Sequence, residues 1–179
     1  MKNSFLVATL ASVALGVSLA AQSSLQISST AFAPNGTIPQ KYACDGERLN
    51  PPLAFSGVPA KAQSLVLIMD DPDVPKTLMP SGVFDHWLVW DLPTTSKGFS
   101  EGDKSAGTTG LNGMGKPGYV APCPPDKEHR YFFKLYALDT KLTGAKIANK
   151  ADLEAAMKGH IVGQAELIGR YNQQKNMQK

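Results

Sequence analysis

The stretch Ser64–Pro93, SLVLIMDDPDVPKTLMPSGVFDHWLVWDLP, contains two short apolar runs that decide the fold. The runs are Leu65–Met69 and Trp87–Trp90. Apolar runs of this length, rich in Val, Ile, Leu and Trp and bounded by turn residues, are typical of core strands rather than helices. We therefore predict two buried strands, joined by a segment that begins with a proline-rich turn.

Polar residues gather where these two strands end and begin. Asp70, Asp71 and Asp73 follow the first run, and His86 opens the second. The prolines of the DPDVP segment fix φ and lack a backbone N–H, so this segment cannot continue a central strand and must form a stiff turn. A stiff turn that presents carboxylates beside a histidine is a candidate functional site.

The rest of the chain reads as further short strands separated by Gly- and Pro-rich turns. We expect strands over residues 25–32, 53–55 and 132–138, a cleanly alternating strand over 161–171, and one short helix over 151–158. Residues 94–118 are polar, contain seven glycines and are expected to form a long loop that is functional or mobile. This pattern predicts a mainly β protein, an antiparallel β-sandwich with a few short peripheral helices.

The N-terminus has the features of a secretory signal peptide. Lys2 precedes a nearly continuous apolar or small-residue segment, Phe5–Leu19, and Ser18-Leu19-Ala20 fits the small-x-small cleavage rule. The apolar segment is shorter than the roughly 20 residues that a transmembrane helix needs. We predict a cleaved signal over residues 1–21, a single domain over 22–179, and a periplasmic or secreted location. An uncleaved anchor is the alternative.

Size and charge narrow the classes of partner. About 160 residues remain after cleavage, enough for one domain with its own core. The chain has 18 Lys and Arg against 15 Asp and Glu, spread along its length. Nucleic-acid binding proteins carry a basic stripe, so we expect no nucleic-acid partner. We also expect no integral membrane segment after signal cleavage, so that any membrane association is peripheral.

The sequence contains two cysteines, Cys44 and Cys123. In an oxidising compartment they are candidates for a single disulfide. Such a bond would close a loop of roughly 80 residues, for which chain entropy gives an upper estimate of about 4–5 kcal/mol. Two separately buried thiols are the alternative.

Four polar residues at predicted strand ends allow three interpretations. They are Asp71, Asp73, His86 and His129, and Tyr131 lies two residues after His129 on the same strand face. A hydrolase using a Ser/His/Asp set is one, although the sequence lacks a Gly-x-Ser-x-Gly elbow. A metal site is another, without His-x-His or Cys-x-x-Cys spacing to support it. The third is a pocket for a small anion or headgroup, in which the imidazoles, the phenol and backbone N–H groups donate to a phosphate-like group.

Several of these segments together resemble one family. DPDVP, His86-Trp87, the segment GYVAPCPP and His129-Arg130-Tyr131 resemble the phosphatidylethanolamine-binding protein family, also called Raf kinase inhibitor-like proteins. The Cys-Asp-Gly turn at Cys44, the Asn-Pro-Pro segment and GHIVGQAELIG are similar to its bacterial branch. The resemblance runs from about Ile27 to Tyr171.

The resemblance implies a β-sandwich with a small preformed anion pocket. The residues that match the family's pocket are Asp71, Asp73, His86, Ala121, Pro122, Cys123, Pro124, His129 and Tyr131. Ala121 stands where the family usually has glycine. The implied role is a binding protein rather than an enzyme, without metal or cofactor, which acts on a phosphate-containing small molecule or lipid headgroup and serves as an inhibitor or modulator of partner proteins. A small hydrolase or lyase that uses His86 and His129 with Asp71 is the alternative.

The implied pocket has an electrostatic difficulty. A phosphate beside two ionised aspartates at low dielectric is repelled by roughly several kcal/mol. A protonated histidine, a shared proton or a cationic group on the ligand must offset this repulsion. We therefore expect zwitterionic headgroups such as phosphoethanolamine to bind better than bare phosphate, and more tightly below the pKa of the histidines.

Overall fold

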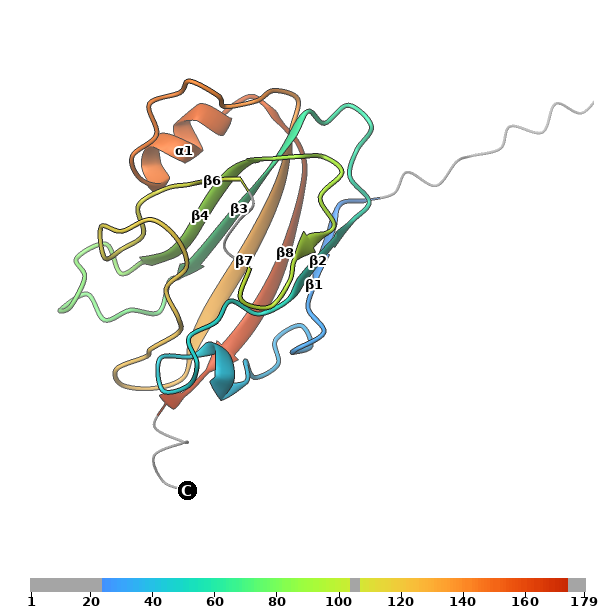
Figure 1. Ribbon diagram of the computed structural model, residues 1–179. Coiled ribbons are helices and arrows are strands. Elements are labelled where there is room, and N and C mark those ends of the chain that lie inside the picture. The colour runs from blue at the N-terminus through green and yellow to red at the C-terminus, as the bar shows by residue number, and fades with distance from the viewer. Residues whose placement is uncertain (1–23, 104–106, 174–179) are drawn as a thin grey trace, which may run out of the picture.

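The computed structural model describes residues 24–103 and 107–173 (Figure 1). It has one helix, α1 (Lys150–Met157), and a short 3-10 turn at Gln40–Tyr42 within the described residues. The strands are β1 (Gln26–Ser28), β2 (Leu53–Ser56), β3 (Ser64–Asp71), β4 (Phe84–Leu92), β5 (Gly98–Phe99), β6 (Thr108–Thr109), β7 (His129–Leu138) and β8 (Ile161–Tyr171).

The strands form two antiparallel sheets. The larger sheet has the order β6-β4-β3-β7-β8, and the smaller has the order β1-β2-β5. Figure 1 shows the small sheet against one face of the large sheet and α1 over the other. The predicted β-sandwich is confirmed, and the strands expected around Leu65–Met69 and Trp87–Trp90 are β3 and β4.

Strand β3 is central and buried on both faces, which explains why its sequence is a continuous apolar run rather than an alternating one. Leu65, Leu67 and Met69 point into the core between the two sheets. Val66 and Ile68 point the other way, into a second core closed by α1. Because side chains alternate along a strand, the last two residues of β3 separate as well. Asp70 lies on the α1 face and Asp71 on the sandwich side.

Asp70 is held on the α1 face by two lysines. Lys134 of β7 donates to its Oδ2 at 2.8 Å, and Lys150, the first residue of α1, contacts the same oxygen. Asn149 caps this helix by accepting a hydrogen bond from the backbone N–H of Asp152. The ion pairs therefore join the N-terminus of α1 to the central strands.

Two expectations about the connections need correction. The first strand is shorter than residues 25–32, because the pairing with β2 covers only Gln26–Ser28. The segment 94–118 is not without structure of its own, since β5 pairs with β2 and β6 pairs with β4. Strands of two residues have no periodicity, and only their tertiary pairing defines them.

The predicted signal peptide, residues 1–21, lies outside the described residues. No helix in the two described ranges is long and apolar enough to cross a membrane.

Candidate functional site

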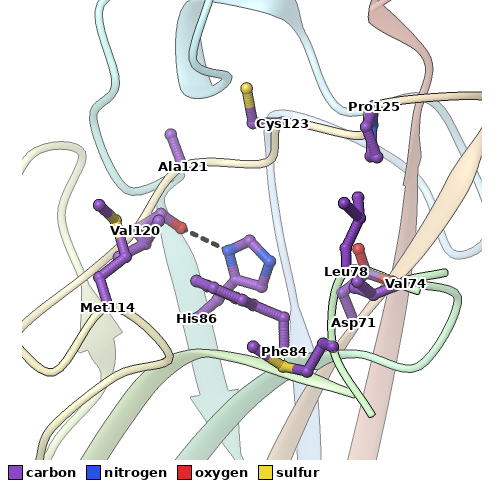
Figure 2. A pocket seen from close by; sticks show the side chains of 11 residues that line it. Asp71, Val74, Leu78, Phe84, His86, Met114, Val120, Ala121, Cys123 and Pro125 are labelled. Carbon is purple, nitrogen blue, oxygen red and sulfur yellow. Dashed lines mark hydrogen bonds between the residues drawn. The ribbon is translucent and has the colours of Figure 1, made fainter. Parts of the chain in front are cut away.

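Three neighbouring strands bring their polar ends to one edge of the large sheet. Asp71 is the last residue of β3, His86 lies near the start of β4, and His129 is the first residue of β7. The order β4-β3-β7 makes these strands neighbours. Residues 120–125, which precede β7, lie across the cavity from Asp71 and Phe84 (Figure 2).

A cavity of about 400 Å³ lies between these elements. Asp71 and His86 are its polar side chains, both buried. The other lining side chains are mostly apolar and come from the segments 74–84 and 114–125: Val74, Leu78, Met79, Phe84, Met114, Val120, Ala121, Cys123 and Pro125. Leu78 and Met114 are 65% and 61% exposed, which places them at the mouth of the cavity. The cavity therefore has a buried polar end and an apolar, solvent-facing rim.

A β-bulge directs His86 toward this cavity. Met69 pairs with Trp87, and the next residue of β3, Asp70, pairs with Asp85, so His86 has no partner on β3. An extra residue of this kind changes the direction of a side chain relative to simple alternation. The His86 ring lies 5.2 Å from the Tyr131 ring in an edge-on arrangement and 4.8 Å from the Phe84 ring, measured between centroids.

Backbone contacts fix the proton of His86. Its Nδ1 lies 2.8 Å from the carbonyl oxygen of Val120, which can only accept, so Nδ1 carries the hydrogen. The Val120 N–H donates in return to the His86 carbonyl at 2.9 Å. Burial lowers the pKa of His86 to about 4, since the apolar surroundings disfavour the charged ring. His86 is therefore neutral near pH 7, and its Nε2 is a hydrogen-bond acceptor.

His129 bridges two carboxylates behind the cavity. Its Nδ1 lies 2.7 Å from Asp71 Oδ2, and its Nε2 lies 2.8 Å from Asp126 Oδ1. Both contacts need a proton, so the three groups share two protons. Asp71 also accepts the backbone N–H of Asp73 at 2.8 Å. Burial raises the pKa of Asp71, and the hydrogen bond to His129 opposes that rise.

Tyr131 lies behind His86 and does not line the cavity. Its side chain is fully buried. Burial, with a smaller contribution from the Asp71 carboxylate, raises the pKa of its hydroxyl well above the ordinary value, so the phenol stays neutral. Tyr131 therefore supports the His86 ring by packing.

Asp73 lies apart from the cavity. It forms a bidentate ion pair with Arg130, with oxygen–nitrogen distances of 2.8 and 2.7 Å, and accepts the backbone N–H of Arg130 at 3.0 Å. These contacts, the side-chain hydrogen bond foremost, hold the pKa of Asp73 below its ordinary value. Asp73 fastens the DPDVP turn to β7 and does not line the cavity as the resemblance implied.

The loop before β7 offers fewer backbone donors than the sequence suggested. Three of the five residues in 121–125 are prolines, which have no N–H. Only the N–H groups of Ala121 and Cys123 remain, and that of Cys123 also faces the Tyr131 hydroxyl. Ala121 and Cys123 line the cavity, whereas Pro122 and Pro124 are buried behind it. We expected the imidazoles and the backbone of this loop to donate hydrogen bonds to a phosphate. For His86 this expectation fails, and in the loop only two backbone N–H groups are left to act as donors.

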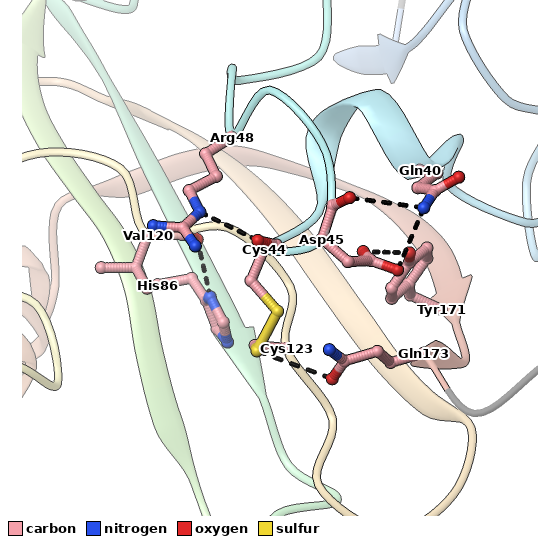
Figure 3. Close-up of a disulfide and its surroundings, with 9 residues drawn as sticks. All are labelled: Gln40, Cys44, Asp45, Arg48, His86, Val120, Cys123, Tyr171 and Gln173. Carbon is pink, nitrogen blue, oxygen red and sulfur yellow. Dashed lines mark hydrogen bonds between the residues drawn. A yellow bond between two sulfur atoms is a disulfide. The ribbon is translucent and has the colours of Figure 1, made fainter. Parts of the chain in front are cut away.

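The disulfide between Cys44 and Cys123 is present, with a Cα–Cα distance of 5.3 Å (Figure 3). It joins the turn at residues 43–46 to the cavity wall. The backbone N–H of Cys44 also donates to the Pro122 carbonyl at 2.9 Å. This result confirms the predicted pairing and removes the alternative of two free thiols.

Several cavity residues escaped sequence reasoning. Leu78, Met79 and Met114 lie in turn-rich segments whose contact with the cavity depends on chain folding. Large apolar residues inside otherwise polar loops were the available signal. Asp126, the second partner of His129, was missed because an acidic residue in a Pro- and Lys-containing loop is usually a solvated turn residue.

The geometry gives no support to the two catalytic interpretations. Within residues 24–103 and 107–173, no set of three or more His, Cys, Asp or Glu side chains is arranged to hold a metal ion. In the same part of the chain, no Ser or Thr hydroxyl is hydrogen-bonded to His86 or His129. Both His129 nitrogens are engaged by carboxylates in this structure.

Comparison with known proteins places the chain among related sequences. The family model described as phosphatidylethanolamine-binding protein matches residues 28–172. A UPF0098 protein of Chlamydia pneumoniae is 49% identical over 147 residues, covering 82% of this chain and 98% of the relative. A UPF0098 protein of Methanothermobacter thermautotrophicus is 46% identical over 153 residues, with the same two coverages.

Solved structures agree with the architecture. A phosphatidylethanolamine-binding protein homologue from Chlamydia trachomatis superposes with a TM-score of 0.80 at 45% identity, covering 83% of this chain and 97% of that one. YbcL of E. coli, described as a member of the mammalian PEBP family, superposes with a TM-score of 0.73 at 24% identity, covering 82% and 97%. The second likeness concerns the fold alone.

Proposed function

The chain belongs to the phosphatidylethanolamine-binding protein family, and from this premise we propose that it is an exported binding protein for a phosphoethanolamine-type headgroup. The observation that carries the proposal is the two-part cavity. A buried carboxylate and a neutral imidazole form its polar end, and apolar side chains form its mouth. A compact polar head with an apolar substituent matches both parts.

Electrostatics favour a zwitterion over a simple anion. Asp71 is buried at the polar end, and neutral His86 supplies no positive charge against a phosphate. Like charges at low dielectric repel by roughly several kcal/mol. A zwitterion brings its own ammonium group, which offsets the carboxylate.

The exposed rim favours a lipid as the source of this headgroup. Leu78 and Met114 are more than half exposed, and both lie at the mouth. Residues 74–84 and 110–120 contain two lysines, Lys76 and Lys116, and neither Asp nor Glu. Apolar side chains flanked by lysines suit the interface of a bilayer that contains anionic lipid.

Binding without turnover fits the arrangement better than catalysis. The hydrolase alternative needs a nucleophile next to a histidine whose second nitrogen is oriented by a carboxylate. His129 has carboxylates on both sides, and His86 Nδ1 is hydrogen-bonded to a backbone carbonyl. We therefore propose that the ligand is released unchanged.

Export is supported by the disulfide and by the N-terminal sequence. The Cys123 side of the bond is exposed and the Cys44 side is partly buried. A disulfide that thiol reductants can reach persists in an oxidising compartment.

Titration with glycerophosphoethanolamine tests this function. We expect saturable binding by calorimetry, with NMR shifts in residues around His86 and Ala121. Asp71→Asn should weaken binding at least roughly tenfold, because it removes the buried negative charge. Asp73→Asn is the matched control and should bind like the parent. Failure to bind at millimolar ligand, or equal binding by Asp71→Asn with its fold intact, would contradict the proposal.

A further inference from the structure

In the described part of the chain, β8 is the one long strand that lies at the edge of a sheet. It has eleven residues and ends the large sheet beside β7 (Figure 1). The strands at the other three sheet edges, β1, β5 and β6, have two or three residues each. A short edge strand offers little to another chain, whereas a long one presents a row of backbone groups that can pair. A further strand would therefore add at β8.

Only the C-terminal part of β8 is covered along its outer edge. Residues 35–38 run beside it, and Asn35 donates its backbone N–H to the Ile168 carbonyl at 2.7 Å. The backbone of Arg170 both donates to this segment and accepts from it. Among the residues that the structure describes, none is hydrogen-bonded to the outer edge of residues 162–166.

The uncovered part of β8 directs backbone groups out of the sheet. Along an antiparallel pair, successive residues direct their N–H and C=O groups alternately toward the partner strand and away from it. Arg170 directs both groups away from β7, so Gln164 and Glu166, an even number of residues earlier in the same register, do so too. The register also skips Val162, which has no partner on β7. Three positions of this edge are therefore available for pairing.

The side chains along this edge do not prevent pairing. Proteins usually block a sheet edge with lysine, proline or a covering segment. Residues 161–166, IVGQAE, contain neither Lys nor Pro. Gln164 and Glu166 are exposed, and a cavity of about 410 Å³ lies over them beside Lys134 and Tyr136. No described segment fills this space.

The length of the uncovered stretch fits a second copy of the same strand. The stretch runs from Ile161, where β8 begins, to Leu167, just before the first residue that contacts segment 35–38. Gln164 lies at its centre. Two copies related by a two-fold axis can therefore pair antiparallel, with Gln164 opposite its counterpart and Val162 opposite Glu166.

Each opposed pair in this register is chemically compatible. A carboxamide has both donor and acceptor groups, so two Gln164 side chains can hydrogen-bond to each other. Glu166 faces Val162 rather than another acid. The two Glu166 residues lie four positions apart along the joined strands, which is roughly 14 Å. This distance exceeds the Debye length of about 8 Å at physiological ionic strength, so their repulsion is screened.

We propose that β8 pairs with β8 of a second copy of this chain through residues 162–166, which joins the two large sheets into one. The paired residues lie in the half of β8 farther from His129, whose partner in the register is Tyr171. Because the two copies of β8 run in opposite directions, the two headgroup cavities lie at opposite ends of the joined sheet and both stay open. The dimer is therefore independent of the proposed function.

Sedimentation equilibrium of the mature chain, residues 22–179, measures the pairing. We expect a dimer with a dissociation constant on the order of 10–100 µM, because one paired edge buries less than the roughly 1,600 Å² of a standard interface. Gln164→Glu and Gln164→Lys each place like charges opposite one another and should weaken the dimer at least roughly tenfold. An equimolar mixture of these two variants should dimerise at least as tightly as the parent, because opposite charges then face each other.

Thr95→Glu is the matched control. Thr95 is exposed in the turn after β4, which β3 and β7 separate from β8 in the large sheet. This variant adds the same charge as Gln164→Glu and should dimerise like the parent. All three variants should bind glycerophosphoethanolamine with the parent's affinity, which shows that they are folded.

Three results would overturn the proposal. The first is a parent chain that stays monomeric at millimolar concentration, which would leave the edge of β8 to an extended segment of a different protein. The second is a dimer that Gln164→Glu does not weaken, since another surface would then hold it. The third is a mixture of Gln164→Glu and Gln164→Lys that stays as monomeric as either variant alone.

Discussion

Asp71 and Asp73 are two residues apart in one turn, yet their surroundings give them different roles. Asp71 is buried and holds the fully buried His129 ring. Asp73 is paired with Arg130, whose side chain is 45% exposed. Removing one partner of a buried ion pair leaves the other as a buried polar or charged group without a partner, which destabilises the fold. Exposed ion pairs contribute little to stability.

The two aspartates should therefore differ in unfolding experiments. We expect Asp71→Ala to lower the free energy of unfolding by about 3 kcal/mol, because His129 loses a buried partner. Asp73→Ala should lower it by about 1 kcal/mol or less. Urea unfolding of both variants measures the difference. Equal losses would mean that His129 does not depend on Asp71.

His86 should make the protein less stable in acid. Its folded pKa of about 4 lies below the ordinary value of 6.5, so the unfolded chain takes up a proton that the folded chain does not. Stability therefore falls as the pH drops from about 6.5 toward 4, by roughly 1.4 kcal/mol per pH unit from this group. The raised pKa of Asp71 acts in the opposite direction over the acidic range.

Comparison with His86→Asn isolates this contribution. Between about pH 7 and pH 4.5 the parent should lose about 2–3 kcal/mol more than the variant, by linkage. Urea midpoints at the two pH values give the measurement. Parallel pH profiles would show that the His86 ring is not kept neutral by burial.

At the scale of elements, a bulge and a cross-link position the site. The bulge in β4 inserts His86 between Asp85 and Trp87, which pair with consecutive residues of β3. The Cys44–Cys123 bond fixes the loop wall that carries Ala121. The sheet therefore places one side of the cavity, and the disulfide places the other.

Removing the disulfide should loosen the cavity wall as well as the fold. For Cys44→Ala combined with Cys123→Ala we expect a loss of about 2–4 kcal/mol in the free energy of unfolding. Affinity for glycerophosphoethanolamine should fall several-fold, since the wall must be ordered on binding. Thermal unfolding and titration measure the two effects.

The reduced parent protein is the matched control for this variant. Both lack the covalent bond, and the reduced protein keeps the two sulfur atoms, so a loss that the two share belongs to the bond itself. Unchanged affinity after reduction would mean that the Cys44–Pro122 hydrogen bond and packing are enough to hold the cavity wall in place.

At the scale of the whole molecule, the most exposed large apolar side chains gather at the cavity mouth. Leu78 and Met114 lie there, whereas Ile161, 44% exposed, begins β8 beside Leu138, at the opposite end of β7 from His129. This distribution defines a rim at one end of the sandwich and provides a matched residue far from it.

We expect the rim to contribute to vesicle binding. Leu78→Ser combined with Met114→Ser should weaken co-sedimentation with vesicles of phosphatidylethanolamine and anionic lipid by roughly tenfold or more, since apolar burial contributes about 25 cal/mol per Å². Binding of soluble glycerophosphoethanolamine should fall by much less, because this probe has no acyl chains to contact the mouth. Ile161→Ser should bind vesicles like the parent. An equal loss for Ile161→Ser would argue against a defined docking face.

Sequence patterns were sufficient for the architecture. The double-sided burial of β3 produced the continuous run Leu65–Met69, and the one-sided burial of β8 produced the alternation in Ile161–Tyr171. Short-range periodicity reports which faces of a strand are buried. The helix and the cysteine pairing were also predictable, since capping is local and only one pair of cysteines exists.

The site was only partly predictable. The convergence of Asp71, His86, His129 and Tyr131 followed from strand ends that meet in a sheet. Three features of the site could not be predicted in this way. They are the pairing of Asp73 with Arg130, the second carboxylate on His129, and the position of Leu78 and Met114 at the rim. Each depends on contacts between segments whose spacing in the sequence contains no information about distance.

By itself, the sequence determined the longer strands, the only possible pair of disulfide partners and the set of polar groups available to a pocket, because burial and backbone restriction act residue by residue. Tertiary structure alone decided what those groups can do. The His86 proton is fixed by a carbonyl 34 residues away, and the Asp71 carboxyl group is hydrogen-bonded to a histidine 58 residues away. Hydrogen bonding and burial at such contacts, rather than residue type, turn an expected donor into an acceptor.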